Sequence, residues 1–397
     1  MKCTPHDFIG TNGVLLMKKN TRQLNPSRRH FLSVGAASIL SLATGSNSAA
    51  QARRSRRRSP SVHTEKRGNP PVVVGENGHR FEVEHDWPKL PGKYSWQTTH
   101  NVAVDRAGNL YVIHEGKREL VDHPAIFVFD RQGRYVRSFG SEFQGGGHGL
   151  EVRDEPGGEF LYVTGYQHLK NFAKYDLHGE RVWMKRAPME SGLYAEGEHQ
   201  ATTGTWGRNR FMPTNFAFLP DGGFMLADGY GAFRIHRYDA EGKWLSVFGT
   251  PGIEDGQFNL PHGLWLDDRQ DEPAIVVADR VNGRLQWFGL DGQHKKTLGG
   301  FMLPANCDIY KDELLVPDLS ARITLLDAEN RPVAQLGEDA KWREEVLKDG
   351  MALRSRPNDW KDGRFLHPHD ACYDKDGNIF VAEWVAPGRI TRLVRRA

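Results

Sequence analysis

The chain has 397 residues, of which 53 are lysine or arginine, 50 are aspartate or glutamate and three are cysteine. This length allows one to three domains, and the many glycines and few cysteines are typical of a soluble globular protein. The net charge of +3 is uneven: residues 1–52 carry +5 and residues 53–67 carry +6, so residues 68–397 carry −8. This asymmetry excludes any inference from the overall basic charge to an acidic or nucleic-acid partner.

Residues 1–52 are predicted to be a twin-arginine signal peptide. The pattern Ser27-Arg28-Arg29-His30-Phe31-Leu32 precedes a weakly apolar run over residues 31–44, and Ala50-Gln51-Ala52 fits a cleavage site. The apolar run is too short to span a bilayer comfortably. We therefore expect a periplasmic or extracellular protein with no transmembrane segment in the mature chain, translated from Met1 or Met17.

Residues 53–78 are predicted to be a basic, disordered linker. Residues 53–67 carry seven lysine or arginine residues and few apolar side chains, so this stretch cannot bury enough apolar surface to fold. The alternating segment Arg80-Phe81-Glu82-Val83-Glu84 is then the first strand that the pattern predicts.

The rest of the chain is built from a repeat that is clearest over residues 258–292. It opens with Leu-Pro-His-Gly and contains three short apolar runs, which are separated by turn residues such as Asn282-Gly283. A polar residue opens the first strand of each copy: His100, His148, Asn215, His262, Asn306 and His369. The intervals between these anchors are 48, 67, 47, 44 and 63 residues, which indicates a period of about 45 residues with two insertions.

Six copies predict an all-β, six-bladed propeller over residues 79–397, arranged around a central channel. The last copy supplies only three strands, so residues 79–85 are predicted to pair with residues 389–395 and close the ring, which removes open sheet edges. The two insertions, residues 188–210 and a short helix over residues 338–348, are candidates for shaping access to the channel.

Some recurring residues are predicted to be scaffold. An acidic residue ends each second strand and an arginine opens each third strand, so each pair should hold a turn. These residues are Asp228, Asp279, Asp318 and Glu383, with Arg234, Arg284, Arg322 and Arg389. Cys307 and Cys372 are interpreted as buried small residues, with a disulfide as the alternative.

Three anchors depart from a scaffold role, because His148, His262 and His369 fall in alternate blades. Alternate blades of a six-fold ring lie about 120° apart, so three imidazoles would meet on one axis. Such a set leaves the fourth position of a tetrahedral zinc ion open for water or substrate. The alternative is that Pro-His-Gly starts a strand well, with the imidazole bonded to backbone. His100 is a possible fourth ring that does not fit the three-fold spacing.

The segments LPHGL, VVADRVNGRLQWF, LADGYGAFRI and HPHDA resemble NHL-repeat proteins and, among these, the catalytic domain of peptidyl-α-hydroxyglycine α-amidating lyase. The resemblance covers residues 80–397. It implies zinc bound by His148, His262 and His369, with Tyr230 and Arg280 as catalytic residues.

The same resemblance implies a structural calcium ion at Asp370, with backbone carbonyls of Val102 and Leu150. The implied reaction splits a hydroxyglycine-extended peptide into a peptide amide and glyoxylate. One departure concerns Glu115, which stands where the family carries a catalytic arginine.

Three functional classes stay open at this stage: a zinc-dependent lyase, another metal-dependent propeller hydrolase, and a non-enzymatic propeller that binds protein or glycan. The histidine-rich channel argues against a lactonase-like calcium site, which usually has carboxylate and amide ligands. We expect a monomer that takes a small-molecule or peptide substrate in the channel and does not bind nucleic acid.

Overall fold

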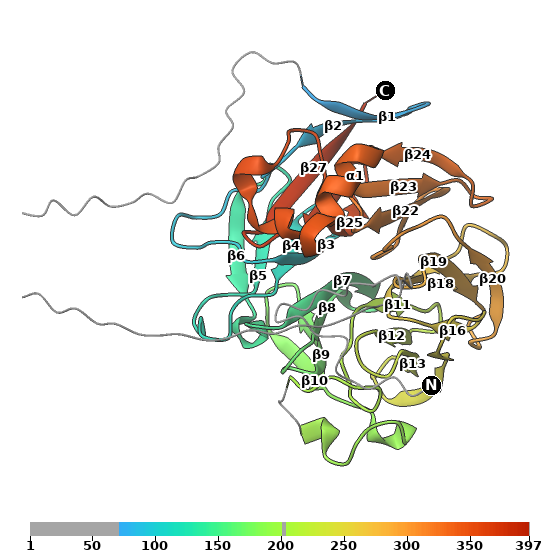
Figure 1. The fold of residues 1–397 in the computed structure, drawn as a ribbon. Coiled ribbons are helices and arrows are strands. Elements are labelled where there is room, and N and C mark those ends of the chain that lie inside the picture. The colour runs from blue at the N-terminus through green and yellow to red at the C-terminus, as the bar shows by residue number, and fades with distance from the viewer. Residues whose placement is uncertain (1–70, 201–203, 397) are drawn as a thin grey trace, which may run out of the picture. The chain divides into compact units, whose positions relative to one another are not determined.

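The computed structural model describes residues 71–200 and 204–396 (Figure 1). The predicted signal peptide and most of the predicted linker lie outside these residues. The end of the predicted linker is part of the fold, because β1 (Val73–Glu76) pairs with β2 (His79–Glu84) through a turn at Asn77-Gly78. The ordered sheet therefore begins before the predicted boundary at residue 79.

The described residues form six antiparallel blades arranged as a β-propeller, as predicted (Figure 1). Blade 1 consists of β3 (Thr99–Val104), β4 (Leu110–His114), β5 (Ile126–Phe129) and β6 (Tyr135–Phe139). Blade 2 consists of β7 (Gly147–Glu155), β8 (Gly158–Gly165), β9 (Asn171–Asp176) and β10 (Arg181–Lys185). Blade 3 consists of β11 (Phe216–Phe218), β12 (Phe224–Asp228), β13 (Arg234–Tyr238) and β14 (Trp244–Phe248). Blade 4 consists of β17 (Pro261–Asp267), β18 (Ala274–Asp279), β19 (Arg284–Phe288) and β20 (His294–Leu298). Blade 5 consists of β21 (Asp308–Tyr310), β22 (Glu313–Asp318), β23 (Arg322–Leu326) and β24 (Pro332–Leu336). Blade 6 consists of β25 (Pro368–Tyr373), β26 (Ile379–Glu383) and β27 (Arg389–Arg396), together with β2 and β1.

Apolar clusters between neighbouring blades hold the ring together. Each of six clusters draws its side chains from two successive blades, and the set runs from the contact of blade 1 with blade 2 round to that of blade 6 with blade 1. One sheet buries only one face against a single neighbour, so a closed ring is the arrangement in which every blade covers both faces.

The N-terminal strand completes the last blade, as predicted. Strand β2 pairs antiparallel with β27 from Arg80 opposite Arg396 to Glu84 opposite Arg392. Phe81 of β2 is fully buried in the cluster between blades 5 and 6. Closure thus joins residues more than 300 positions apart through both backbone pairing and apolar packing.

Most helical residues lie between β10 and β11 and between β24 and β25, the two segments that include the predicted insertions. Helix α1 (Ala340–Leu347) confirms the predicted helix, and its N-cap Asp339 accepts hydrogen bonds from the backbone of Lys341 and Trp342. Short 3-10 turns are η2 (Ser141–Phe143), η3 (Met189–Ser191), η4 (Glu198–Gln200), η5 (Lys348–Gly350), η6 (Ala352–Ser355) and η7 (Pro357–Asp359). Strands β15 (Thr250–Pro251) and β16 (Gln257–Phe258) form a small parallel pair. No helix among the described residues is long and apolar enough to cross a membrane.

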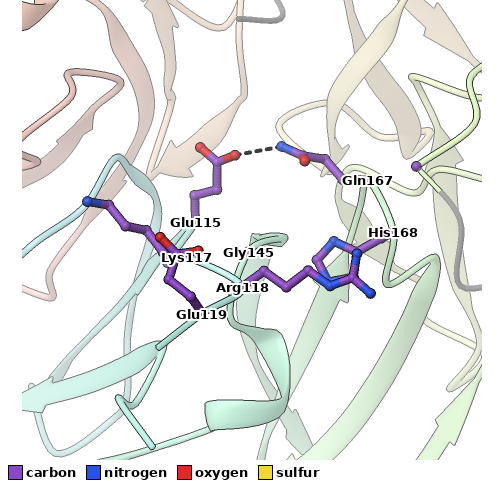
Figure 2. Close-up of a pocket in the computed structure, with 9 residues that line it drawn as sticks. Glu115, Lys117, Arg118, Glu119, Gly145, Gln167 and His168 are labelled. Carbon is purple, nitrogen blue, oxygen red and sulfur yellow. Dashed lines mark hydrogen bonds between the residues drawn. The ribbon is translucent and has the colours of Figure 1, made fainter. Parts of the chain in front are cut away.

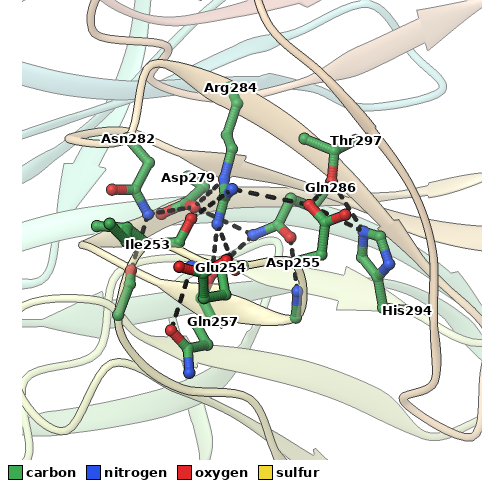
Figure 3. Close-up of polar contacts among 12 residues, drawn as sticks. Ile253, Glu254, Asp255, Gln257, Asp279, Asn282, Arg284, Gln286, His294 and Thr297 are labelled. Atoms are coloured by element: carbon green, nitrogen blue, oxygen red, sulfur yellow. Dashed lines mark hydrogen bonds and ion pairs between the residues drawn. The ribbon is translucent and has the colours of Figure 1, made fainter.

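The recurring acid and arginine pair with each other in three of the four blades that carry them. In blade 4, Arg284 Nε donates to Asp279 Oδ2 at 2.8 Å and its Nη atoms donate to backbone carbonyls of the preceding loop (Figure 3). Arg389 pairs with Glu383 in the same way in blade 6. Blade 3 differs, because Asp228 accepts from backbone amides and from Tyr194 instead of from an arginine.

Cys307 and Cys372 are both buried and free. They lie in different inter-blade clusters, Cys307 between blades 4 and 5 and Cys372 between blades 6 and 1. Each behaves as the small apolar residue that was predicted.

Candidate metal centre

Four histidines point into the channel from β-bulges at the start of innermost strands. The regular pairing of β3, β7, β17 and β25 with its neighbour is interrupted at one point in each strand, and the unpaired residues include His100, His148, His262 and His369. A bulge turns a side chain away from the usual alternation of a strand, so it can aim an imidazole along the axis.

Glycine follows His148 and His262 because the next blade passes very close. A Cβ atom on Gly149 would lie 2.2 Å from the carbonyl oxygen of Thr214, and one on Gly263 would lie 2.3 Å from Asn306 Cα. The His-Gly pair of the repeat therefore has a local reason: the glycine lets the neighbouring backbone approach the histidine.

Three of the histidines are oriented by the blade that follows them. The Nδ1 atom of His148 lies 3.1 Å from the Thr214 oxygen, that of His262 lies 2.7 Å from the Ala305 oxygen, and that of His369 lies 2.8 Å from the His100 oxygen. A backbone carbonyl can only accept, so each Nδ1 carries the proton and each Nε2 is a free lone-pair donor. Metal-binding histidines usually donate their other ring N–H to a carbonyl or carboxylate in this way, which fixes the orientation of the ring.

These three rings lie close together. The Nε2 atoms of His148 and His262 are 3.1 Å apart, and the ring of His369 lies 5.1 Å from His148 and 4.6 Å from His262 between centroids. Burial lowers the pKa of all three imidazoles well below the usual value. They are therefore neutral, which is the form that binds a metal ion.

A metal ion fits this cluster, although geometry alone selects a slightly different triad from the predicted one. One ring nitrogen each from His100, His148 and His369 lie within 4.8 Å of one another, which is close enough to hold a common ion. The hydrogen-bond pattern instead favours His148, His262 and His369. His262 thus remains a predicted ligand. His100 is a candidate ligand that the three-fold spacing in the sequence did not favour.

The two predicted catalytic residues lie beside the cluster. The Tyr230 hydroxyl is 3.3 Å from His148 Nε2 and 3.0 Å from His262 Nε2, and Arg280 Nη1 donates to the same hydroxyl at 3.3 Å. Burial raises the pKa of Tyr230, and the Arg280 charge opposes that rise. The Nε and Nη2 atoms of Arg280 are buried without a hydrogen-bond partner, so two donors are available beside the cluster.

The sequence did not point to Tyr166 or Trp206, which also reach this region. The Tyr166 ring lies 4.9 Å from His148 and 5.4 Å from Tyr230 between centroids. Trp206, from the first insertion, lies 5.5 Å from Tyr230. Tyr166 could have been found from the sequence. Gly165-Tyr166 stands at the end of the second strand of blade 2, as Gly229-Tyr230 does directly after β12 in blade 3.

A cavity of about 390 Å³ is lined by Glu115 and by loop residues of blades 1 and 2 (Figure 2). The lining residues include Glu115, Lys117, Arg118, Glu119, Gln167 and His168. Glu115 Oε2 lies 3.6 Å from His100 Nε2, while Gln167 and Tyr166 donate to Glu115 Oε1. The carboxylate that departs from the family pattern thus stands between the cavity and the histidines.

Asp370 lies in a separate buried polar cluster in which acidic groups outnumber basic ones. It accepts from the Val102 amide at 2.8 Å and from Asn306 Nδ2 at 2.5 Å, and burial raises its pKa to about 7. Glu151 and Asp308 are also buried, and no ion pair joins the three carboxylates to a basic side chain among the described residues. The predicted Leu150 carbonyl accepts from Asn101 at 2.9 Å. Carboxylate and carbonyl oxygens of this kind are the ligands of Ca²⁺.

The comparisons with known proteins agree with this architecture. No family model matches the chain. Peptidyl-alpha-hydroxyglycine alpha-amidating lyase 1 of Drosophila melanogaster is 27% identical over 372 residues, which is 85% of this chain and 62% of that protein. NHL repeat-containing protein 3 of Homo sapiens is 26% identical over 53% of this chain and 57% of its own length. The chain therefore spans less than two thirds of each of these curated relatives.

Solved structures confirm the fold alone. A gluconolactonase from Xanthomonas campestris superposes with a TM-score of 0.52 at 11% identity, covering 83% of this chain and 96% of its own. A protein of unknown function from Bacteroides thetaiotaomicron gives the same TM-score of 0.52 at 11% identity, over 82% of this chain and 76% of its own. The repeat, the ring of blades and the curated relatives together show an NHL-type six-bladed β-propeller that resembles peptidyl-α-hydroxyglycine α-amidating lyase.

Proposed function

We propose that this chain is an exported, zinc-dependent lyase that cleaves a peptidyl-α-hydroxyglycine into a peptide amide and glyoxylate. Two of its curated relatives are named for that reaction. The observation that carries the proposal is the buried Arg280, which has two unpartnered donors and lies against Tyr230 at the histidine cluster. A buried arginine with free donors is suited to a carboxylate, and the proposed substrate ends in one.

Arg280 would bind the substrate carboxylate through Nε and Nη2, the two donors that have no partner in the protein. Its Nη1 would stay on the Tyr230 oxygen and favour the phenolate form of that side chain. His148, His262 and His369 would hold zinc, which would act as a Lewis acid on the carbinol oxygen when bound.

Tyr230 is the proposed general base. Its oxygen would accept the carbinol O–H proton. The O–H electron pair forms the C=O bond of glyoxylate as the C–N bond breaks, and the C–N pair leaves with the nitrogen, which takes up a proton to give the amide. The near-complete burial of Arg280 and of the histidines would keep bulk water away from the reacting carbon.

The rest of the peptide would lie in the cavity beside Glu115. That cavity is lined by Lys117 and Arg118 as well as by Glu119, so it offers polar groups of both signs to a peptide backbone. A structural Ca²⁺ is proposed at Asp370, where it would favour the ionised forms of Asp370 and the neighbouring Glu151, whose pKa values are raised by burial.

The full chain, loaded with zinc, should release glyoxylate from an α-hydroxyglycine-extended peptide. Arg280→Gln should raise KM by about 10- to 150-fold, because a charge-assisted hydrogen bond contributes about 1.5–3 kcal/mol. Tyr230→Phe should lower kcat with little change in KM, whereas His178→Gln, on an exposed turn, should leave both unchanged. Absence of glyoxylate from the zinc-loaded protein would refute the lyase.

Export is tested separately. Replacing Arg28 and Arg29 with lysine should retain the protein in the cytoplasm, as judged by cell fractionation. An unchanged distribution between fractions would contradict the twin-arginine route.

A further inference from the structure

His100 does not belong to the three-fold pattern of the other histidines. The structure aligns Asn101, not His100, with Asn215 and Asn306, because each asparagine follows the residue whose carbonyl accepts from a histidine Nδ1. This register differs by one residue from the one predicted from the sequence. His100 is therefore equivalent to Thr214 in blade 3 and Ala305 in blade 5. Neither of those two blades has a histidine at this position.

His100 is also the one member of the four whose ring has no hydrogen-bond partner. Its side chain is 1% exposed, Nδ1 has no partner, and Nε2 lies 3.6 Å from Glu115 Oε2, beyond the usual hydrogen-bond distance. A buried imidazole normally satisfies both nitrogens, since an unsatisfied buried polar atom costs about 1–3 kcal/mol. A ligand at the cluster would remove that cost.

The ring faces the cluster directly. Its centroid lies 4.8 Å from that of His148 and 4.7 Å from that of His369, and one nitrogen from each of the three rings lies within 4.8 Å of the other two. On its other side, Glu115 Oε2 lies 3.6 Å from His100 Nε2. A histidine that binds a metal ion through one ring nitrogen often donates its other ring N–H to a carboxylate.

We propose that His100 is a fourth imidazole ligand of the metal centre, opposite His262, so that the site holds its ion with four histidines. This inference rests on the metal centre of the proposed function. It adds a ligand that the three-fold pattern does not contain.

The arrangement of the four rings bears on the type of metal. Five of the six ring pairs have centroid distances between 4.6 and 5.1 Å, whereas His100 and His262, both within the described part of the chain, make no ring contact with each other. In a tetrahedral shell all four ligands are equivalent neighbours, and four protein ligands close a zinc site. One opposed pair suits an ion with five or six ligands, which keeps a position open for substrate.

Cobalt(II) tests the proposal, because its visible absorption is strong in four-coordinate sites and weak in six-coordinate ones. The full chain is stripped with a chelator and titrated with Co²⁺, and wild type is compared with His100→Ala, His262→Ala and the exposed control His178→Ala. His100→Ala reproduces the residue found at the equivalent position of blade 5, so the backbone should accept it. His100→Thr, which copies blade 3, is the second variant if the first fails to fold.

Wild type and His178→Ala should bind one Co²⁺ with weak bands. His100→Ala and His262→Ala should each bind at least about tenfold more weakly, the smallest effect that loss of even an outer-shell partner gives, and with stronger bands. Wild-type affinity and spectrum in His100→Ala would overturn the four-histidine site and leave the lyase proposal standing. The same result in His262→Ala would reduce the site to His100, His148 and His369 and also overturn it. No binding to wild type would overturn both the site and the metal-dependent lyase.

Discussion

Replacing Glu198 with glutamine should destabilise the protein by about 3–5 kcal/mol, because it leaves a buried charge without its counter-ion. Glu198 lies in the first insertion and accepts from Lys170 Nζ at 2.7 Å, from Arg210 Nη1 at 2.8 Å and from the Phe211 amide at 3.0 Å. The side chains of Glu198 and Lys170 are 0% exposed, whereas that of Arg210 is 28% exposed. Arg210 can therefore stay hydrated in the variant, and Lys170 cannot.

Urea unfolding measures this effect. The double variant Lys170→Met with Glu198→Gln should recover most of the loss, because it removes the stranded ammonium group. Glu272→Gln is the control, since Glu272 is 87% exposed in its pair with Lys295 and should give no measurable change. A loss below about 1 kcal/mol in Glu198→Gln, or no recovery in the double variant, would refute the reasoning.

Three further predictions concern the scaffold and use the same unfolding assay. Phe81→Ala should lower the free energy of unfolding by about 3–5 kcal/mol, because Phe81 fills the core that closes the ring. Arg80→Ala, at an exposed position of the same strand, should change it by no more than about 0.5 kcal/mol. Equal losses in the two variants would contradict closure by packing. His114 is held neutral, since Nδ1 accepts from the Gln97 amide and Nε2 donates to the Pro124 carbonyl, and burial lowers its pKa from 6.5 to about 3. Between these values the unfolded chain binds a proton that the folded chain does not, so stability should decrease as the pH is lowered, by up to about 1.4 kcal/mol per pH unit. A His114→Gln profile as steep as that of wild type would exclude this cause. Asp339→Ala should cost about 1 kcal/mol by removing the α1 cap, and no loss would show that the cap is not needed.

The fold could be predicted well from the sequence, because each blade of the propeller corresponds to one copy of a local sequence repeat. Each copy carries its own alternation and turn residues, so the number of blades follows from the count of copies. The pairing of β2 with β27 was also predictable, since the last copy lacks a strand and the segment around Phe81 supplies one. The start of the sheet was harder to predict, because Val73–Glu76 is a four-residue edge strand with no buried residue.

The candidate site was predictable only in part. His148, His262 and His369 share a local context, and their spacing places them in alternate blades, so the sequence by itself determined that three imidazoles face the channel. The structure decided the rest: which carbonyl orients each ring, that Arg280 keeps two free donors beside Tyr230, and that His100 faces the same point while Glu115 lies behind it. Repeats encode the position of a residue within its blade, whereas contacts between blades join residues such as His100 and His369 that lie 269 positions apart. Bulges and loop paths set those distances, and only the closed ring brings them together.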